Sequence, residues 1–384
     1  MKVALIAPQS ALYSGGLERH VRELARGLIG RGATVELLRP NPEARTIRMS
    51  QTDGVVEWRF AASHHSPPVP IPPALAEYLH RKVSSFDVIH AHGRRMLLAL
   101  AAARVRPGRL VFSPLAPVER MLRWPYTGAT RAAVDFASAT ICMSRSDAAL
   151  LCSALPTAAT RVRIVPEGVD ISAIRGATPF PSGRTVALSV GRLVRHKRVD
   201  RAIAAMAALV PTFELVVVGD GPARRRLKAY AADLQVGSRV RFVGRVSDGN
   251  LHRWLKTARL VVTLSQREAF GLQVLEGVAA GAPVVASDIP AHREASEYVP
   301  NGAVTFVAPE GSPFEVADAI KAAVADPAPA PVAALPSWAD VVDETLDVYQ
   351  ELMRRPPTNG ARAGRLRGLR WHERRGRPDA AIEG

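Results

Sequence analysis

The sequence has few cysteines, few aromatic residues and no long apolar run. Its two cysteines, Cys142 and Cys152, are too few for a disulfide framework or a zinc site and fit a reducing compartment. The apolar run at residues 3–7 is far shorter than the ~20 residues of a membrane-spanning helix, so we expect a buried first strand there. Aromatic residues make up 5% of a chain that is 47% hydrophobic, a balance typical of α/β proteins rich in Ala, Val and Leu. These features predict a cytoplasmic protein.

Basic residues outnumber acidic ones, and part of the excess is concentrated at the end of the chain. The formal net charge is +16, and residues 354–384 hold nine Arg against three acidic residues. That segment is rich in Gly, Pro and Arg and lacks an apolar face, which predicts a disordered basic tail. The rest of the chain keeps an excess that favours anionic substrates or a membrane surface, and we expect no nucleic-acid partner.

The hydrophobic pattern alternates between short apolar runs and stretches of helical spacing, which is typical of parallel βαβ units. It pauses at residues 170–185, a polar segment without periodicity, and then restarts. We expect a helix carrying Ile203, Met206, Ala207 and Val210 after the restart, and helical spacing returns near the end of the chain. The pattern predicts an α/β fold of two Rossmann-like domains, a first domain at 1–172, a second at 173–338, a terminal helix at 339–353 and the tail at 354–384.

Two turns that follow predicted strands carry residues suited to an anionic ligand. In open parallel sheets, ligands bind beyond the carboxyl ends of the strands, near helix N-termini. Gly15 and Gly16 after the first strand leave backbone N–H groups open to an anion, although such turns are structural about as often. Arg192 and Lys197 follow Gly191 in a second turn. They are candidate phosphate ligands, whereas elsewhere on a loop they would simply be solvated charges.

Two later turns have different interpretations. Gly219 and Gly221 permit positive φ, Asp220 between them could cap the next helix, and we interpret this turn as structural. Glu268 and Glu276 lie in apolar surroundings at the start of a helix expected to begin near Phe270 and Gly271. Their carboxylates beside a helix N-terminus could accept hydrogen bonds from sugar and ribose hydroxyls. A helix-terminal charge and a partner for an arginine explain them equally well.

The segment SQREAFGLQVLEGVAAGAPVVASDIPAHRE, residues 265–294, resembles the signature of the family four retaining glycosyltransferases, which have the two-domain GT-B fold. The spacing of the two glutamates, the Phe-Gly after the first and the later Gly-Ala-Pro-Val-Val carry the resemblance. It extends from SGGLERH through DVIHAHG, GRLVRHK, VVGDGP and VRFVGRVSD to Pro290. Nearly the whole chain except the tail is therefore covered.

The resemblance implies a retaining, metal-independent hexosyltransferase that uses a UDP-sugar or GDP-sugar as donor and no other cofactor. Charge developing on the leaving diphosphate would be stabilised by basic side chains and a helix dipole, without a protein nucleophile. Glu268 would contact the donor sugar and Glu276 the ribose. The implied residues for the diphosphate and base are Arg192, Lys197, Gly15, Gly16, Gly191, Phe270, Gly271, Leu272, Val243 and Val246.

The chain departs from the family at one catalytic position. A histidine is usual after the strand that corresponds to RLVFSPL, and Leu115 stands there. His90 and His92 end the preceding strand, and His92 is the candidate replacement, although histidines there more often pack or cap. Leu115 therefore keeps open a catalytically weak or inactive relative that binds nucleotide-sugar or assists a partner enzyme. A dinucleotide-dependent enzyme ranks below both, since no Gly-x-Gly-x-x-Gly follows the first strand.

The favoured function is sugar transfer to a cell-envelope, polysaccharide or glycolipid acceptor. A basic and aromatic segment at 118–131 follows Leu115 and could rest on an anionic membrane, helped by the basic tail. Packing of Leu122 and Trp124 into the core is the equally favoured alternative. Peripheral association with the inner face of a membrane therefore stays open beside a purely cytoplasmic location.

Overall fold

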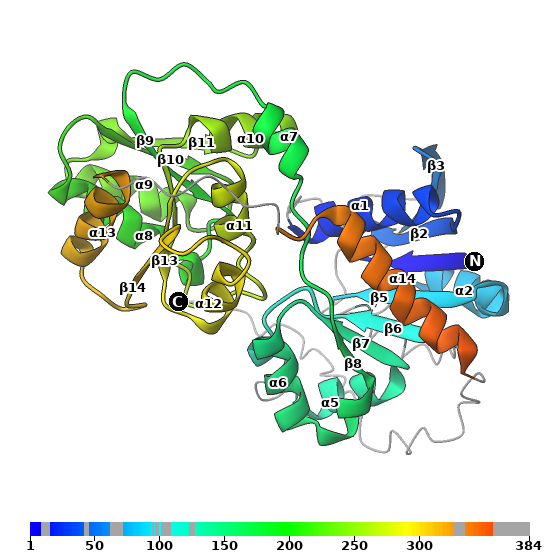
Figure 1. The fold of residues 1–384 in the computed structure, drawn as a ribbon. Helices are drawn as coiled ribbons and strands as arrows, with labels where there is room; N and C mark the ends of the chain where they lie inside the picture. Colours follow the sequence, from blue (N-terminus) through cyan, green and yellow to red (C-terminus); the bar gives the residue numbers. More distant parts are fainter. Residues whose placement is uncertain are drawn as a thin grey trace, which may run out of the picture.

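The computed structural model describes residues 1–8, 16–41, 46–61, 72–93, 96, 100, 109–122, 127–325 and 335–355. Two α/β units, each built on its own sheet, are connected near residue 170 (Figure 1). The expected fold class, two Rossmann-like units, is confirmed.

The first unit contains an eight-stranded sheet in the order β3-β4-β2-β1-β5-β6-β7-β8. All neighbouring strands are parallel except β3 and β4. Its strands are β1 (Lys2–Ile6), β2 (Thr34–Asn41), β3 (Arg48–Thr52), β4 (Val55–Ala61), β5 (Val88–His92), β6 (Leu110–Ser113), β7 (Ala139–Cys142) and β8 (Val162–Ile164). The helices described here are α1 (Gly16–Gly30), α2 (Pro73–Lys82), α4 (Val118–Leu122), α5 (Thr127–Phe136) and α6 (Arg145–Ala154).

The second unit contains a fully parallel six-stranded sheet in the order β11-β10-β9-β12-β13-β14. Its strands are β9 (Thr185–Val190), β10 (Phe213–Val218), β11 (Val240–Gly244), β12 (Leu260–Thr263), β13 (Val284–Ser287) and β14 (Val304–Val307). Its helices are α7 (Ile171–Gly176), α8 (Val199–Ala205), α9 (Arg224–Asp233), α10 (Asp248–Thr257), α11 (Leu272–Ala279), α12 (Pro290–Ser296) and α13 (Pro313–Ala325).

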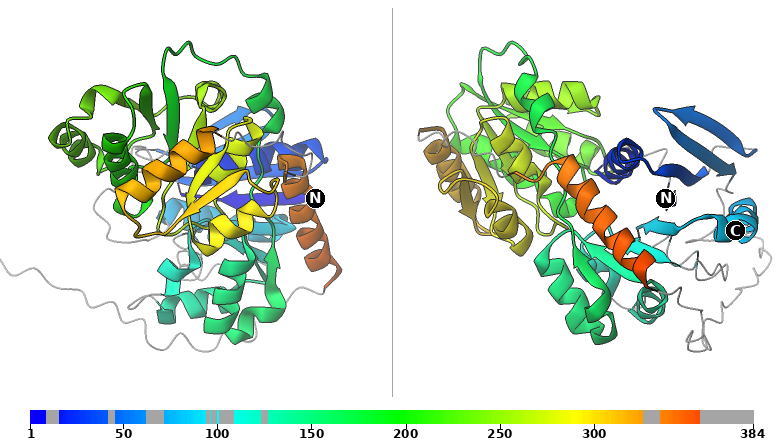
Figure 2. Two further views of the ribbon diagram at one scale, coloured as in Figure 1. Left: turned by 60° about the vertical axis from the view of Figure 1, so that its left-hand side comes forward. Right: turned by 45° about the vertical axis from the view of Figure 1, so that its right-hand side comes forward.

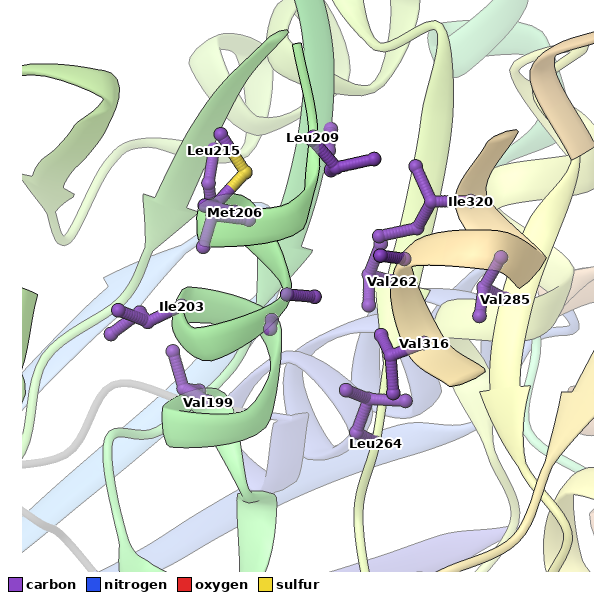
Figure 3. Packing of buried hydrophobic residues seen from close by; sticks show 14 of the residues in the cluster. Val199, Ile203, Met206, Leu209, Leu215, Val262, Leu264, Val285, Val316 and Ile320 are labelled. Carbon is purple, nitrogen blue, oxygen red and sulfur yellow. The ribbon is translucent and has the colours of Figure 1, made fainter. Parts of the chain in front are cut away.

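One face of the second sheet is covered by α8 and α13. Continuous apolar strands buried on both faces are what parallel sheets require, and the strands here are Val- and Leu-rich for that reason. Figure 3 shows the side chains that pack in this layer, from α8 and the turn after it, the sheet, and α13: Val199, Ile203, Met206, Leu209, Leu215, Val262, Leu264, Val285, Val316 and Ile320.

The last helix, α14 (Trp338–Arg354), returns to the first unit and packs against α1 (Figures 1 and 2). Ser337 and Asp340 form a capping box at its start. Val342 and Tyr349 are buried in the core it shares with α1. A side chain on Gly27 of α1 would lie 2.2 Å from Val342 Cγ2, so the two helices approach closely because this position is glycine. The expected terminal helix thus belongs spatially to the first sheet.

Two local expectations need correction. The segment 170–185 is not aperiodic throughout, because α7 begins directly after Asp170, whose side chain accepts a hydrogen bond from the Ala173 N–H. The helix expected to carry Ile203, Met206, Ala207 and Val210 is not continuous: α8 ends at Ala205, a short 3₁₀ turn follows, and Val210 is 57% exposed. Val210 precedes a proline, which disfavours helical backbone at that residue.

Candidate functional site

Two loops of the second unit meet where the strand order reverses. β9 and β12 are neighbours, and the chain leaves them toward opposite edges of the sheet, which creates a crevice beyond their carboxyl ends. The loop after β9 carries residues 191–197, and the loop after β12 carries residues 264–271. The Gln266 N–H donates to the His196 carbonyl at 2.8 Å, so the two loops are tied together. The topology therefore brings the two predicted groups of site residues to one place.

Glycines allow the loop after β9 to lie close to the next strand. Gly219 has φ +127°, and a side chain there would lie 2.0 Å from the Gly191 carbonyl oxygen. Gly191 has φ +143°, and the aliphatic part of Lys197 packs over it. Gly221 does not adopt the expected positive φ; a side chain there would instead meet the Leu193 carbonyl oxygen at 2.4 Å. These contacts give the turn a structural role in placing Lys197.

Lys197 and Glu268 form an ion pair across the crevice loops. Lys197 Nζ donates to Glu268 Oε1, and Ser265 Oγ donates to the same oxygen at 2.6 Å. The two charged side chains are only 16% and 13% exposed. Burial alone would raise the pKa of Glu268, but Lys197 and the nearby His292 outweigh it and leave that pKa below its ordinary value. Glu268 is therefore a carboxylate at neutral pH. Arg192, on the loop that carries Lys197, is exposed.

Glu276 lies inside α11, about one turn after the start of the helix. The helix begins at Leu272, after Gly271 with φ +98°, close to the expected start. Glu276 is 2% exposed, and Arg19 of α1 donates to its Oε1 at 2.8 Å. Burial raises the pKa of Glu276 despite this partner. The arginine that the sequence left unspecified is therefore Arg19, which belongs to the other unit.

The head of α11 is packed on its inner side. Phe270 is 3% exposed and its ring lies edge-on to Tyr298. A side chain on Gly271 would meet the His292 ring at 3.0 Å. The Nδ1–H of His292 donates to the Ser287 carbonyl at 2.9 Å. This hydrogen bond fixes the His292 ring against Gly271, the residue before the helix. Leu272 is the first helical residue, and its backbone lies where the sequence predicts diphosphate contacts.

His92 is part of a buried aromatic cluster. It is fully buried, and its ring lies 4.0 Å from that of His90 and 5.6 Å from that of His20. His90 is hydrogen-bonded to the Tyr349 hydroxyl at 2.6 Å and to Ser113 Oγ at 2.8 Å. Burial and the neighbouring histidines lower the pKa of His92 and His90, so both rings are neutral. The structure thus places His92 in packing, and its catalytic role stays a prediction.

The remaining predicted residues are placed as follows. Leu115 has φ +50°, a left-handed conformation that is costly for a leucine and occurs mainly at functional or strained sites. Val243 and Val246 are partly buried at and after the end of β11 and pack against the core of the second unit. Gly16 begins α1. Gly15, the aromatic part of the segment 118–131, and residues 356–384 of the tail lie outside the described residues. No described helix is long and apolar enough to cross a membrane.

Sequence reasoning missed Arg19 as a site residue. The only signal was the string GGLERH itself, in which an arginine follows the two glycines by three residues on the first helix. Nothing local in that string identifies a partner 257 positions later. The ion pair depends on how the two units face each other.

Two family models match consecutive parts of the chain. The model described as "Glycosyltransferase Family 4" matches residues 14–173, and "Glycosyl transferases group 1" matches residues 170–334. Together they span both sheets and both halves of the crevice.

Several curated proteins are similar over most of the chain. An uncharacterized glycosyltransferase of Methanocaldococcus jannaschii is 26% identical and covers 92% of this chain and 99% of its own length. A phosphatidyl-myo-inositol mannosyltransferase of Mycobacterium leprae is 26% identical over 84% of this chain and 87% of its own. A D-inositol 3-phosphate glycosyltransferase of Acidothermus cellulolyticus is 34% identical over only 34% of this chain and 33% of its own.

Solved structures share the fold at lower identity. Sucrose-phosphate synthase from Thermosynechococcus elongatus superposes with a TM-score of 0.68 at 21% identity, covering 92% of this chain and 96% of that one. HepE from Anabaena, in complex with UDP, superposes with a TM-score of 0.64 at 20% identity, covering 92% and 99%. At these identities the likeness concerns the fold.

Proposed function

The chain belongs to the family four glycosyltransferases with a GT-B fold, and from this premise we propose that it transfers a hexose from a UDP-sugar or GDP-sugar with retention of configuration and without a metal. The observation that carries the proposal is the placement of Glu268, Glu276 and Lys197 around the head of α11, in the crevice where the strand order reverses. Open α/β sheets bind nucleotides at that location.

The head of α11 and the two basic side chains suit a diphosphate. The first N–H groups of the helix have no partner within it and carry the positive end of the helix dipole. Lys197 has three N–H donors, so it can hold Glu268 and still donate to a phosphate oxygen. Arg192 on the same loop adds a second cation. These groups would stabilise the charge that develops on the leaving diphosphate, which is where stabilisation accelerates the reaction.

The two glutamates suit the hydroxyls at either end of the donor. Glu268 is held ionised by Lys197, and a carboxylate accepts hydrogen bonds from sugar hydroxyls through oxygens that its partners leave open. Glu276 lies inside the helix where it would accept from the ribose. Since Glu268 is engaged in holding the sugar, we assign it no nucleophilic role. Attack from the face of the leaving group, with the leaving phosphate taking the acceptor proton, accounts for retention.

For the acceptor we propose a glycolipid or another cell-envelope glycan. Two similar proteins are a phosphatidyl-myo-inositol mannosyltransferase and a D-inositol 3-phosphate glycosyltransferase, so inositol-containing acceptors are the first to test. Association with an anionic membrane is a proposal from the sequence alone. Co-sedimentation of the full chain, and of a chain without residues 354–384, with anionic and neutral vesicles at low and high salt tests it; equal, negligible binding to both would reject it.

A second candidate is a relative that binds nucleotide-sugar but transfers it poorly. The observations that favour it are the leucine at position 115, with its left-handed backbone, and the complete burial of His92. Thermal-shift measurements with UDP, GDP and ADP, followed by their sugars, identify the donor. Hydrolysis and transfer assays with lipid and soluble inositol acceptors then separate the two candidates. Donor binding without turnover would support the second, and stabilisation by none of the nucleotides would reject both.

A further inference from the structure

Helix α1 of the first unit reaches the second unit through two ion pairs, one buried and one exposed. Arg19 Nη1 donates to Glu276 Oε1 of α11 at 2.8 Å, and the side chains are 11% and 3% exposed. Arg22, one turn later, pairs with Asp248 of α10, and these side chains are 40% and 49% exposed. Exposed ion pairs contribute little, whereas a buried charge that loses its partner is costly. The two pairs thus connect the same units, but only the buried pair leaves a costly unpaired charge when one partner is removed.

The Arg19 contact engages only one of the two carboxylate oxygens of Glu276. A carboxylate has two oxygens and about four lone-pair positions, and Arg19 contacts Oε1. Among the described residues, none donates a hydrogen bond to Glu276 Oε2. Arg19 can therefore orient the carboxylate and still leave an acceptor for a hydroxyl.

Arg19 also opposes the protonation of Glu276. Burial raises the pKa of Glu276, Glu167 and Asp248 raise it further, and Arg19 is the group that lowers it. A protonated carboxyl would have to donate one hydrogen bond and would accept fewer from a ribose. The pKa of Glu276 is therefore linked to a side chain from the other unit.

We propose that Arg19 is a positioning residue for the donor nucleotide: it reaches across from the first unit and orients the Glu276 carboxylate for the ribose. The inference rests on the proposed function, in which Glu276 accepts from the ribose. Because Arg19 and Glu276 belong to different units, the ribose site is complete only when the units are closed. A donor that uses this carboxylate therefore favours the closed arrangement, and closure favours the donor by the same factor.

The charged groups around the pair are few, which allows a pH test. The connection before α7 contributes Glu167 and Asp170, and α10 contributes Asp248 and His252. Glu167 is bonded to His20 at 3.0 Å. Burial, followed by the charge of Arg19, lowers the pKa of His252, so this ring is neutral at and above pH 7. Loss of Arg19 would raise the pKa of both Glu276 and His252, and a Glu276→Gln background isolates the part that acts through Glu276.

The experiment measures nucleotide affinity by calorimetry between pH 5.5 and 8.5, with the nucleoside diphosphate that gives the largest thermal shift. Arg19→Met should weaken binding roughly 10-fold at pH 7, the range of a hydrogen bond to a charged group, and by a larger factor at pH 6. The sign follows because, without Arg19, Glu276 protonates at a higher pH and its affinity for the ribose is lost earlier as pH falls. Arg19→Lys should restore part of the affinity.

Two controls separate positioning from domain contact. Arg22→Met removes the neighbouring ion pair between the same units and should leave affinity and its pH profile unchanged. Pyrophosphate, which lacks the ribose, should bind Arg19→Met and the wild type equally. In a Glu276→Gln background, which cannot ionise, Arg19→Met should have little further effect.

The outcomes are distinguishable. Equal weakening by Arg19→Met and Arg22→Met, or equal weakening toward pyrophosphate and nucleotide, would overturn the inference in favour of a role in holding the units together. If Arg19→Met binds the nucleotide with wild-type affinity and a wild-type pH profile, the inference about Arg19 is also overturned. The proposed function would stand in that case, because the wild type still binds the nucleotide. A wild type that binds none of the nucleotides would defeat the proposed function itself. If Arg19→Met unfolds, Arg19→Lys and Glu276→Gln provide the same comparison of pH profiles.

Discussion

Replacement of Lys197 by methionine should destabilise the second unit by leaving Glu268 without its cation. Methionine keeps much of the aliphatic stem that packs over Gly191, so the change removes charge more than volume. Breaking a buried ion pair by removing one partner costs ~3–5 kcal/mol. Here Ser265 still donates to Glu268 and the side chains retain 13–16% exposure. We therefore expect a loss of about 2–3 kcal/mol, measured as a shift in the urea midpoint.

The double variant tests the cause. Lys197→Met with Glu268→Gln removes both charges, so we expect it to be more stable than Lys197→Met alone by about 1–2 kcal/mol. Arg195→Met changes a neighbouring exposed cation on the same turn and should shift stability by less than about 0.5 kcal/mol. Strictly additive losses in the double variant would refute the argument, since uncoupled residues could not be holding each other's charge.

The same reasoning fixes a pH dependence. In the wild type the pKa of Glu268 is lowered, so its contribution to stability is present above the unfolded value of ~4.3 and is lost as pH falls through the lower folded value. Without Lys197 the pKa of Glu268 would rise from its wild-type value, because the largest opposing charge is gone and burial remains. The stability difference between wild type and Lys197→Met should therefore be largest near neutral pH and shrink toward pH 4. A difference that stays constant over this range would contradict a charge-based cause.

Three further results are expected. Gly219→Ala should cost on the order of 3 kcal/mol in unfolding free energy and displace the loop that carries Lys197, because φ is +127° and the added carbon meets the Gly191 carbonyl. Gly183→Ala is the matched control, because a side chain there has nothing within 4 Å. Equal costs in the two variants would contradict this prediction. Stability of the wild type should fall as pH drops below ~6.5, because the pKa of buried His90 is lowered and the native state binds fewer protons than the unfolded one. Thermal midpoints that stay unchanged between pH 7.5 and 5.5 would contradict this prediction. Arg192→Ala should lower turnover ~10²-fold in assays that continue in EDTA, as for a lost electrostatic contact with the leaving group; metal-dependent turnover together with a tolerated Arg192→Ala would reject this mechanism.

Local patterns in the sequence predicted the elements, and topology decided what the elements brought together. The apolar runs predicted the strands, since parallel strands buried on both faces require continuous Val and Leu. The Phe-Gly before α11 indicated where the helix begins, because Gly271 has the left-handed φ that precedes it. Glu268 and Lys197 were both singled out as ligands, but their mutual ion pair, 71 positions apart, could not be read from either local string.

Long-range packing accounts for the expectations that the sequence could not decide. His92 ends a strand at a carboxyl edge, where a ligand or a packed residue is equally compatible with the local pattern. Its ring packs against that of His90, to which the Tyr349 hydroxyl of α14 is hydrogen-bonded from 259 positions away. The periodicity of α14 predicted a helix but contained no information about which sheet it would cover.

The return of α14 brings the two chain crossings between the units side by side: the Val169 N–H donates to the Pro336 carbonyl at 2.9 Å. A side chain on Gly168 would lie 2.8 Å from the Trp338 backbone nitrogen, so the paired crossings are held tightly. The units also contact each other away from these crossings.

Two buried carboxylates of the second unit occupy such contacts, and both point at helices of the first. Glu294 of α12 accepts from the Arg145 and Ser146 N–H groups at the start of α6, at 2.6 and 3.1 Å, where the helix dipole favours a negative charge. Glu276 accepts from Arg19. Only the second of these carboxylates lies at the proposed donor site, so only it can be stabilised in place by a nucleotide. Under the proposed role of Arg19, a bound nucleotide would therefore stabilise the Glu276 contact between the units and not the Glu294 contact.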